Sequence, residues 1–139
     1  MEPSSRHLAF HGTIVLLLGL LCGGPYARAV NRNAAAHIVH SWRVAHASLP
    51  IGAMLMFAVA GLLSWFAVAV ELKWLIAAAL IVSSYAFCFS LPLAATVGHR
   101  GLSSKGPFAA KLVFLGNMLG AWASVVAALA LVYAGYVSL

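Results

Sequence analysis

Charge is the scarcest property of this sequence. Only 7% of the 139 residues are charged, whereas 64% are hydrophobic, and the mean hydropathy is +1.02. About a quarter of the residues of a soluble domain are charged, so a soluble fold of this composition would leave a large apolar surface in water. A water-soluble domain is therefore excluded, and we expect an integral membrane protein.

Acidic residues and cysteines are also few. The acidic residues are Glu2 and Glu71, which argues against hydrolysis by a pair of carboxylates. The net charge of +6 is typical of basic loops that contact anionic membrane lipid. No array of aromatic and basic residues lies on a polar scaffold, so no nucleic-acid partner is expected. Cys22 and Cys88 lie inside apolar segments, where we expect buried thiols and no disulfide.

Four long apolar segments dominate the chain, at residues 8–28, 43–70, 74–97 and 108–137. Each exceeds the roughly 20 residues that a helix needs to cross a bilayer. We therefore predict one domain over residues 1–139, an all-α integral membrane four-helix bundle. A polar hairpin at Glu71-Leu72-Lys73 is predicted to join the second and third spans. The first segment also resembles a signal peptide with a small-x-small site at 27–29, but His11-Gly12 favours a packed helix.

Pairs of glycines spaced by four residues predict close helix contacts. They occur at Gly19-x-x-x-Gly23 and Gly116-x-x-x-Gly120. Asn117 lies within the second pair, and an amide in hydrocarbon must find a partner. That partner is either another helix or a bound ligand.

His46 is the residue around which a binding site is predicted. It opens the second span, and no charge follows it before Glu71. A neutral imidazole there can bind a metal. Helical spacing places Trp42, Arg43 and Pro50 on the same face. Pro50 removes a hydrogen bond to the His46 carbonyl, and the small residues nearby leave room for a flat group (Ala47, Ser48, Gly52, Ala53). We therefore predict a haem with His46 as axial ligand, lined by Trp42 and Arg43.

The basic residues predict the orientation in the membrane. They gather around the first and third loops (Arg28, Arg32, Arg43, Arg100, Lys105, Lys111), whereas Arg6 and Lys73 lie on the other side. The positive-inside rule places the first and third loops in the cytoplasm, and we expect a bacterial inner membrane. His11 and His46 then lie near opposite surfaces, so one chain does not ligate one iron with both. An open sixth position, which allows chemistry on a substrate, is the expectation.

Three short motifs carry a resemblance to a known family. They are His11-Gly12, Trp42-x-x-Ala45-His46 and Arg100-Gly101-Leu102. Their order and spacing resemble those of styrene oxide isomerases, small four-helix membrane proteins that bind haem b. The resemblance implies that His46 is the axial ligand and that three subunits form a trimer with haem between neighbours. It also implies that ferric iron acts as a Lewis acid on an apolar or aryl epoxide, and a 1,2-hydride shift gives the aldehyde (a Meinwald rearrangement).

Two positions depart from that family. It holds the substrate with an Asn six residues after the ligand and a Tyr on the third helix, and this chain has Gly52 and Leu91 there. Tyr85 and Asn117 are the candidate catalytic residues that would replace them. An isomerisation needs an electrophile and a dry cavity, which an apolar chain with a bound metal supplies.

Two other functions fit the same residues. One is a haem protein without isomerase activity, such as a sensor or an electron carrier. The other is a small membrane protein that is not an enzyme, in which His46 is merely hydrogen-bonded near the headgroups.

Overall fold

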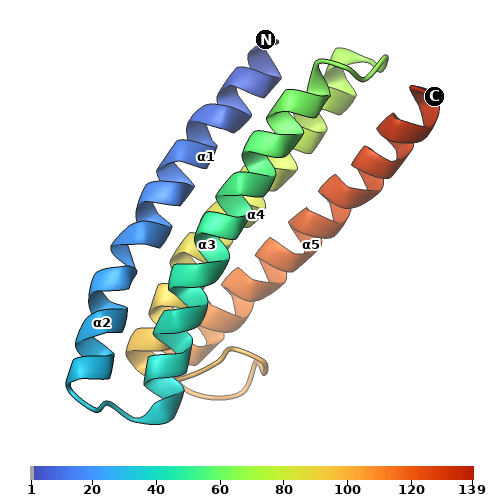
Figure 1. Cartoon of the computed structure of the whole chain (residues 1–139). Coiled ribbons are helices and arrows are strands. Elements are labelled where there is room, and N and C mark those ends of the chain that lie inside the picture. The colour runs from blue at the N-terminus through green and yellow to red at the C-terminus, as the bar shows by residue number, and fades with distance from the viewer. Residues whose placement is uncertain (1) are drawn as a thin grey trace.

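The computed structural model describes residues 2–139, which fold into helices joined by short connections. The helices are α1 (Pro3–Leu21), α2 (Gly23–Asn31), α3 (Ala36–Leu63), α4 (Val70–Val97) and α5 (Phe108–Val137). Only Cys22 separates α1 from α2, and the two form one arm (Figure 1). Both termini lie at one end of the molecule, together with the α3–α4 connection, and the other two connections lie at the opposite end (Figure 1).

Four helical stretches are long and apolar enough to cross a membrane: Pro3–Asn31, Ala36–Leu63, Val70–Val97 and Phe108–Val137. The shortest have 28 residues, or about 42 Å at 1.5 Å per residue, against about 30 Å of hydrocarbon. Their polar ends therefore have room to extend into the headgroup layer. The all-α class and the four apolar helices were predicted correctly, and they indicate an integral membrane protein.

The helices do not pack as a closed square. α4 contacts α1, α3 and α5, and α1 contacts α3. Within residues 2–139, α5 packs against no helix except α4, and Figure 1 shows it apart from α3. The main core is built mostly from α1, α3 and α4, with buried alanines of α5 at its edge, and includes Leu8, Met56, Leu63 and Ile76, each fully buried. The space between α3 and α5 is consequently free of helix–helix contact.

Glycines bring the helices together, as their spacing predicted. A Cβ on Gly19 would lie 2.5 Å from Cδ of Pro50 and 2.8 Å from Cβ of Leu49. On α5, a Cβ on Gly120 would lie 2.8 Å from the ring of Phe87. Since real Cβ atoms do not approach other atoms so closely, α1 meets α3, and α5 meets α4, through bare backbone.

Two predicted boundaries were wrong. The hairpin predicted at Glu71–Lys73 lies inside α4, and the connection is formed by residues 64–69. Glu71 is compatible with the first turn of α4 because a carboxylate stabilises a helix N-terminus. Lys73 is only 6% exposed and forms an ion pair with Glu2 at 2.7 Å, so its charge is compensated by the residue that precedes α1.

The second predicted boundary concerns α3. It begins at Ala36, seven residues before the predicted start, and ends at Leu63. His37 and His40 therefore belong to a helix, whose first turns extend beyond the apolar segment. α3 continues through Pro50, whose ring packs against Gly19 of α1.

We predict that Gly19→Ala destabilises the protein, although alanine favours helices. The added methyl group would overlap Pro50 and Leu49, and overpacking of this kind costs about 1–3 kcal/mol. Thermal unfolding of the detergent-solubilised protein, followed by circular dichroism, measures the change. The matched control is Gly61→Ala on α3, where a Cβ has no neighbour within 4 Å; it should be neutral or stabilising. Equal melting temperatures for the two variants would contradict the predicted contact.

Candidate functional site

The His46 side chain points from α3 toward the junction of α1 and α2. Its Nδ1 lies 3.0 Å from the carbonyl oxygen of Gly19, and its half-buried ring stacks on Tyr26 with centroids 6.2 Å apart. A carbonyl only accepts hydrogen bonds, so Nδ1 carries the proton in this contact. In a neutral imidazole the lone pair then lies on Nε2.

This arrangement is the one that metal-binding histidines use. Such a histidine donates its second ring N–H to a carbonyl or carboxylate, which fixes the tautomer and orients the ring. Gly19 lies in the last turn of α1, where helix carbonyls lack intrahelical partners. The backbone of α1 therefore holds His46 in the tautomer and orientation that leave Nε2 available.

Glycine also clears space around the imidazole. A Cβ on Gly23 would lie 3.0 Å from Cε1 and 3.5 Å from Nε2 of His46, whereas a Cβ on Gly24 would meet nothing within 4 Å. Any side chain at residue 23 would press on the ring. The Gly19-x-x-x-Gly23 pattern thus serves two purposes, since one glycine admits α3 and the other admits the imidazole.

The other residues predicted at the haem lie apart from His46. Arg43 is exposed and donates a hydrogen bond from Nη2 to Nδ1 of His40 at 2.9 Å. Trp42 is half-buried and lines a separate cavity of about 240 Å³, whose wall includes Cys22, Cys88 and Pro92. Within the described chain, neither side chain forms a hydrogen bond or ring contact with His46.

A cavity of about 400 Å³ is lined mainly by α3 and α4, with one residue each from α1 and α5; it lies where α3 and α5 do not meet. Most of its lining is apolar, with four serines (Val15, Ser48, Leu49, Ile51, Gly52, Leu55, Met56, Leu80, Ser83, Ser84, Phe87, Leu91, Ser124). We call it the central cavity. Gly52 and Leu91, the two positions that depart from the family pattern, both line it. Its volume is in the range of small-molecule sites.

His46 does not line the central cavity. At 3.6 residues per turn, Ser48 and Gly52 lie about 160° and 120° around α3 from His46. The imidazole faces α1 and α2, whereas the residues that line the cavity opposite α3 come mainly from α4. Within one chain, α3 therefore separates the candidate metal ligand from the candidate substrate cavity.

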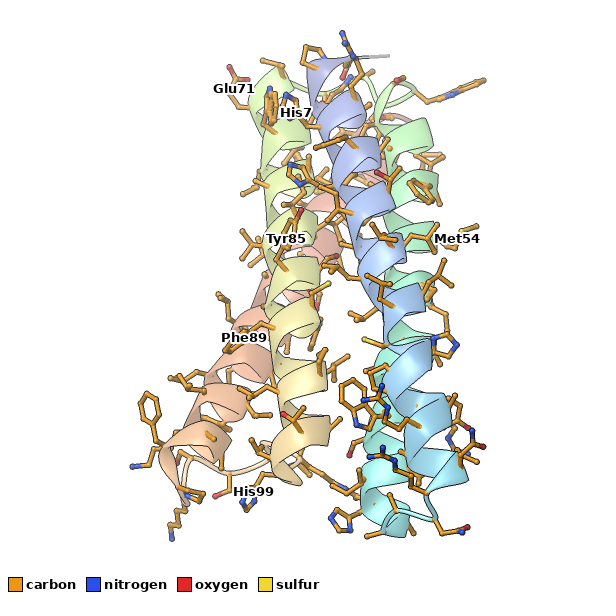
Figure 2. All side chains as sticks on the ribbon, turned by 90° about the vertical axis from the view of Figure 1, so that its left-hand side faces the viewer. His7, Met54, Glu71, Tyr85, Phe89 and His99 are labelled. Atoms are coloured by element: carbon orange, nitrogen blue, oxygen red, sulfur yellow. The ribbon has the colours of Figure 1, made fainter. Side chains whose placement is uncertain are left out.

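Tyr85 takes part in a different contact. Its hydroxyl and Nδ1 of His11 share a hydrogen bond at 2.9 Å, with the rings edge to face. Figure 2 shows Tyr85 partway along α4, below His7 and Glu71, with His99 at the far end. His11 lies eight residues before Gly19, or about 12 Å along a helix, so the structure keeps the His11–Tyr85 pair away from His46. Tyr85 does not line the central cavity.

Asn117 holds a loop. Its Nδ2 donates to the carbonyl oxygens of Arg100 at 3.2 Å and Gly101 at 3.5 Å. Gly101 has φ +63°, and a Cβ there would lie 2.4 Å from Cγ1 of Val113, so only glycine lets the loop approach α5. The hydrogen-bond partner that the sequence required for Asn117 is thus the backbone of the loop. The predicted contact of Asn117 with a substrate has no geometric support in one chain.

Sequence reasoning missed the hydrogen-bond partner of His46 and the hydroxyls of the central cavity. The glycine spacing at 19 and 23 indicated a helix contact, but no pattern pairs a carbonyl with a ring 27 residues away. Ser48 was noted only as a small residue near Pro50, and Gly52 also as the position where the family has an Asn. Their orientation toward α4 and α5 depends on how α3 is rotated in the bundle.

Comparison with known families gives one match along almost the whole chain. The family model described as styrene oxide isomerase matches residues 4–136. No curated protein matches the chain. The matched range includes His46, the central cavity and the Asn117-bound loop.

We predict that Asn117→Leu releases the loop between α4 and α5. The variant removes the donor to Arg100 and Gly101, and a net hydrogen bond is worth about 1 kcal/mol, or about fivefold in an equilibrium. Limited digestion with trypsin, which cleaves after Arg100 and Lys105, should become about fivefold faster. Ser124→Ala, farther along α5, is the control and should leave cleavage unchanged. An unchanged rate in Asn117→Leu would show that the side chain does not hold the loop.

Proposed function

The chain belongs to the styrene oxide isomerase family, and on that premise we propose that it is a membrane isomerase that converts an apolar or aryl epoxide to an aldehyde with the help of haem b. The observation that carries the haem assignment is the hydrogen bond from Nδ1 of His46 to Gly19 at 3.0 Å. It leaves Nε2 as a metal ligand of fixed orientation.

The residues around His46 fit an iron ligand. The imidazole lies beside Gly23, where an added Cβ would crowd its Cε1 atom at 3.0 Å and leave Nε2 in ordinary contact at 3.5 Å. Tyr26 supports the ring on one side. When bound there, a ferric haem would supply a Lewis acid for the epoxide oxygen, so that the benzylic C–O bond opens and a 1,2-hydride shift follows.

The chain itself would supply a dry environment for this rearrangement. The walls of the central cavity carry no ionisable side chain among the described residues, so nothing there activates water or stabilises a separated ion pair. Leu55, Phe87 and Leu91 offer apolar surface to an aryl group. Exclusion of water protects a carbocation-like transition state from hydrolysis.

A complete site requires more than one copy of the chain. His46 and the central cavity lie on opposite sides of α3, so the imidazole of one copy would meet the cavity of a neighbour. We propose a homotrimer, as in the family, with haem between adjacent subunits. Arg43 and Trp42, which do not contact His46 in one chain, would then be available to the haem at the same end of α3.

The orientation in the membrane is part of the proposal. Arg28 and Arg32 lie at the end of α2, and Arg100 and Lys105 lie in the α4–α5 connection, at the same end of the molecule. Positive loops of this kind remain in the cytoplasm. We place this end on the cytoplasmic side of a bacterial inner membrane, with an epoxide substrate reaching the site through the lipid.

A haem protein without isomerase activity is the second candidate. It is favoured by Gly52 and Leu91, which line the central cavity and have no side-chain donor or acceptor for a substrate. Purified wild type that binds haem but forms no aldehyde from styrene oxide would support this candidate over the isomerase.

We predict that His46→Gly abolishes the Soret band of the protein purified from haem-supplemented cells, and that added imidazole restores it. Imidazole can occupy the space of the missing ring, so recovery separates a lost ligand from a misfolded chain. His99→Gly is the control, because His99 lies in the loop at the end of α4, and it should keep the band. The absorbance should be recorded from about 350 to 700 nm. Aldehyde formation from styrene oxide should be lost in the variant and recovered together with the Soret band. A Soret band that persists in His46→Gly without imidazole would exclude His46 as the ligand.

A further inference from the structure

Four hydroxyl groups line the central cavity, and three of them already donate their single proton. Ser83 donates to the carbonyl of Gly120 at 2.8 Å, and Ser84 to the sulfur of Met56 at 3.2 Å. Ser124 donates to the carbonyl of Ala121 at 2.7 Å. A hydroxyl has one proton, so these three serines can offer a ligand only lone pairs.

Ser48 is different. Ser48 lines the same cavity at its exposed edge, and its side chain forms no hydrogen bond within residues 2–139. Helix serines commonly donate to a carbonyl three or four residues earlier, as Ser41 and Ser138 do in this chain. Among the described residues that line the central cavity, Ser48 is therefore the one side chain with a free O–H group.

Gly52 leaves this hydroxyl uncovered. It lies one helical turn after Ser48 and lines the same cavity. Side chains on a helix lean toward its N-terminus and cover the preceding turn, so a larger residue at 52 would lie over Ser48. A Cβ on Gly52 has no neighbour within 4 Å, which leaves the space open on the cavity side.

We propose that Ser48 is the residue that orients the substrate in this chain, by donating a hydrogen bond to the oxygen of a neutral apolar epoxide, and that Gly52 makes this contact possible. The inference rests on the proposed function and adds to it a residue that determines specificity. The oxygen of the ligand lies at the α3 wall, and its apolar part lies against Phe87 and Leu91 of α4, which also line the cavity. A ligand without an acceptor atom gains nothing from Ser48.

Two probes of similar shape separate this contact from apolar binding. Styrene oxide carries an acceptor oxygen, and ethylbenzene has the same carbon skeleton without oxygen. Where the full-length protein in detergent forms aldehyde, initial rates give the KM of styrene oxide and the inhibition constant of ethylbenzene; where it forms none, equilibrium dialysis gives both affinities. Ser48→Ala should weaken binding of styrene oxide about five- to tenfold, the loss expected for one net hydrogen bond, and leave ethylbenzene within about twofold.

Ser124→Ala is the matched control, since it removes a hydroxyl from the same cavity whose proton is already donated. It should change neither affinity. Gly52→Leu should cover Ser48 and abolish the preference for styrene oxide over ethylbenzene, whereas Gly61→Leu, also on α3 and with open space around its Cβ, should preserve it.

The same experiment distinguishes this inference from the proposed function. If wild type forms aldehyde but Ser48→Ala binds styrene oxide as tightly and keeps its KM, the role of Ser48 is refuted while the isomerase remains. If wild type forms no aldehyde but the preference for styrene oxide depends on Ser48, the proposed reaction fails and the contact stands. A wild-type protein that binds neither probe would overturn the assignment of the cavity.

Discussion

The close approach of α1 to α3 is the contact on which the candidate metal site depends. Gly19 of α1 lies against Pro50 and Leu49 of α3, with no room for a methyl group between the helices. At this distance the Gly19 carbonyl reaches Nδ1 of His46 at 3.0 Å. If the helices were separated by even one side chain, that hydrogen bond would be lost and the ring would be free to rotate. Packing between two apolar helices therefore determines the tautomer of an imidazole.

The second constraint is the asymmetry of the bundle. α5 packs against α4 and, in the described chain, not against α1 or α3, so the wall of α3 that carries Ser48 and Gly52 faces the central cavity. The opposite wall carries His46. The proposed trimer requires such a helix, because each copy would present an imidazole to one neighbour and a cavity to another. In a membrane, where burial of apolar surface does not drive helices together, such contacts depend on close packing and polar groups.

Much of the fold was predictable from the sequence because apolar length is a local property. The fourth span was predicted at residues 108–137, as α5 has it, and the glycine pairs at 19 and 116 lie at helix contacts. The hairpin at Glu71–Lys73 was wrong because charged residues were assumed to end a helix. The ion pair between Lys73 and Glu2 involves residues 71 positions apart, which no local pattern reveals. Asn117 was predicted to need a partner, yet the sequence could not choose between a helix, a ligand and the loop that it holds.

The sequence by itself determined that the chain is a four-span helical membrane protein with an imidazole at the start of its second long apolar segment. Composition, apolar length and the position of His46 suffice for this, since each depends on neighbouring residues alone. Only the tertiary structure decided which nitrogen of His46 is available, which serine retains a free proton, and that His46 and the central cavity lie on opposite sides of α3. Those properties depend on the rotation and spacing of whole helices, which are set by contacts between residues far apart in the chain.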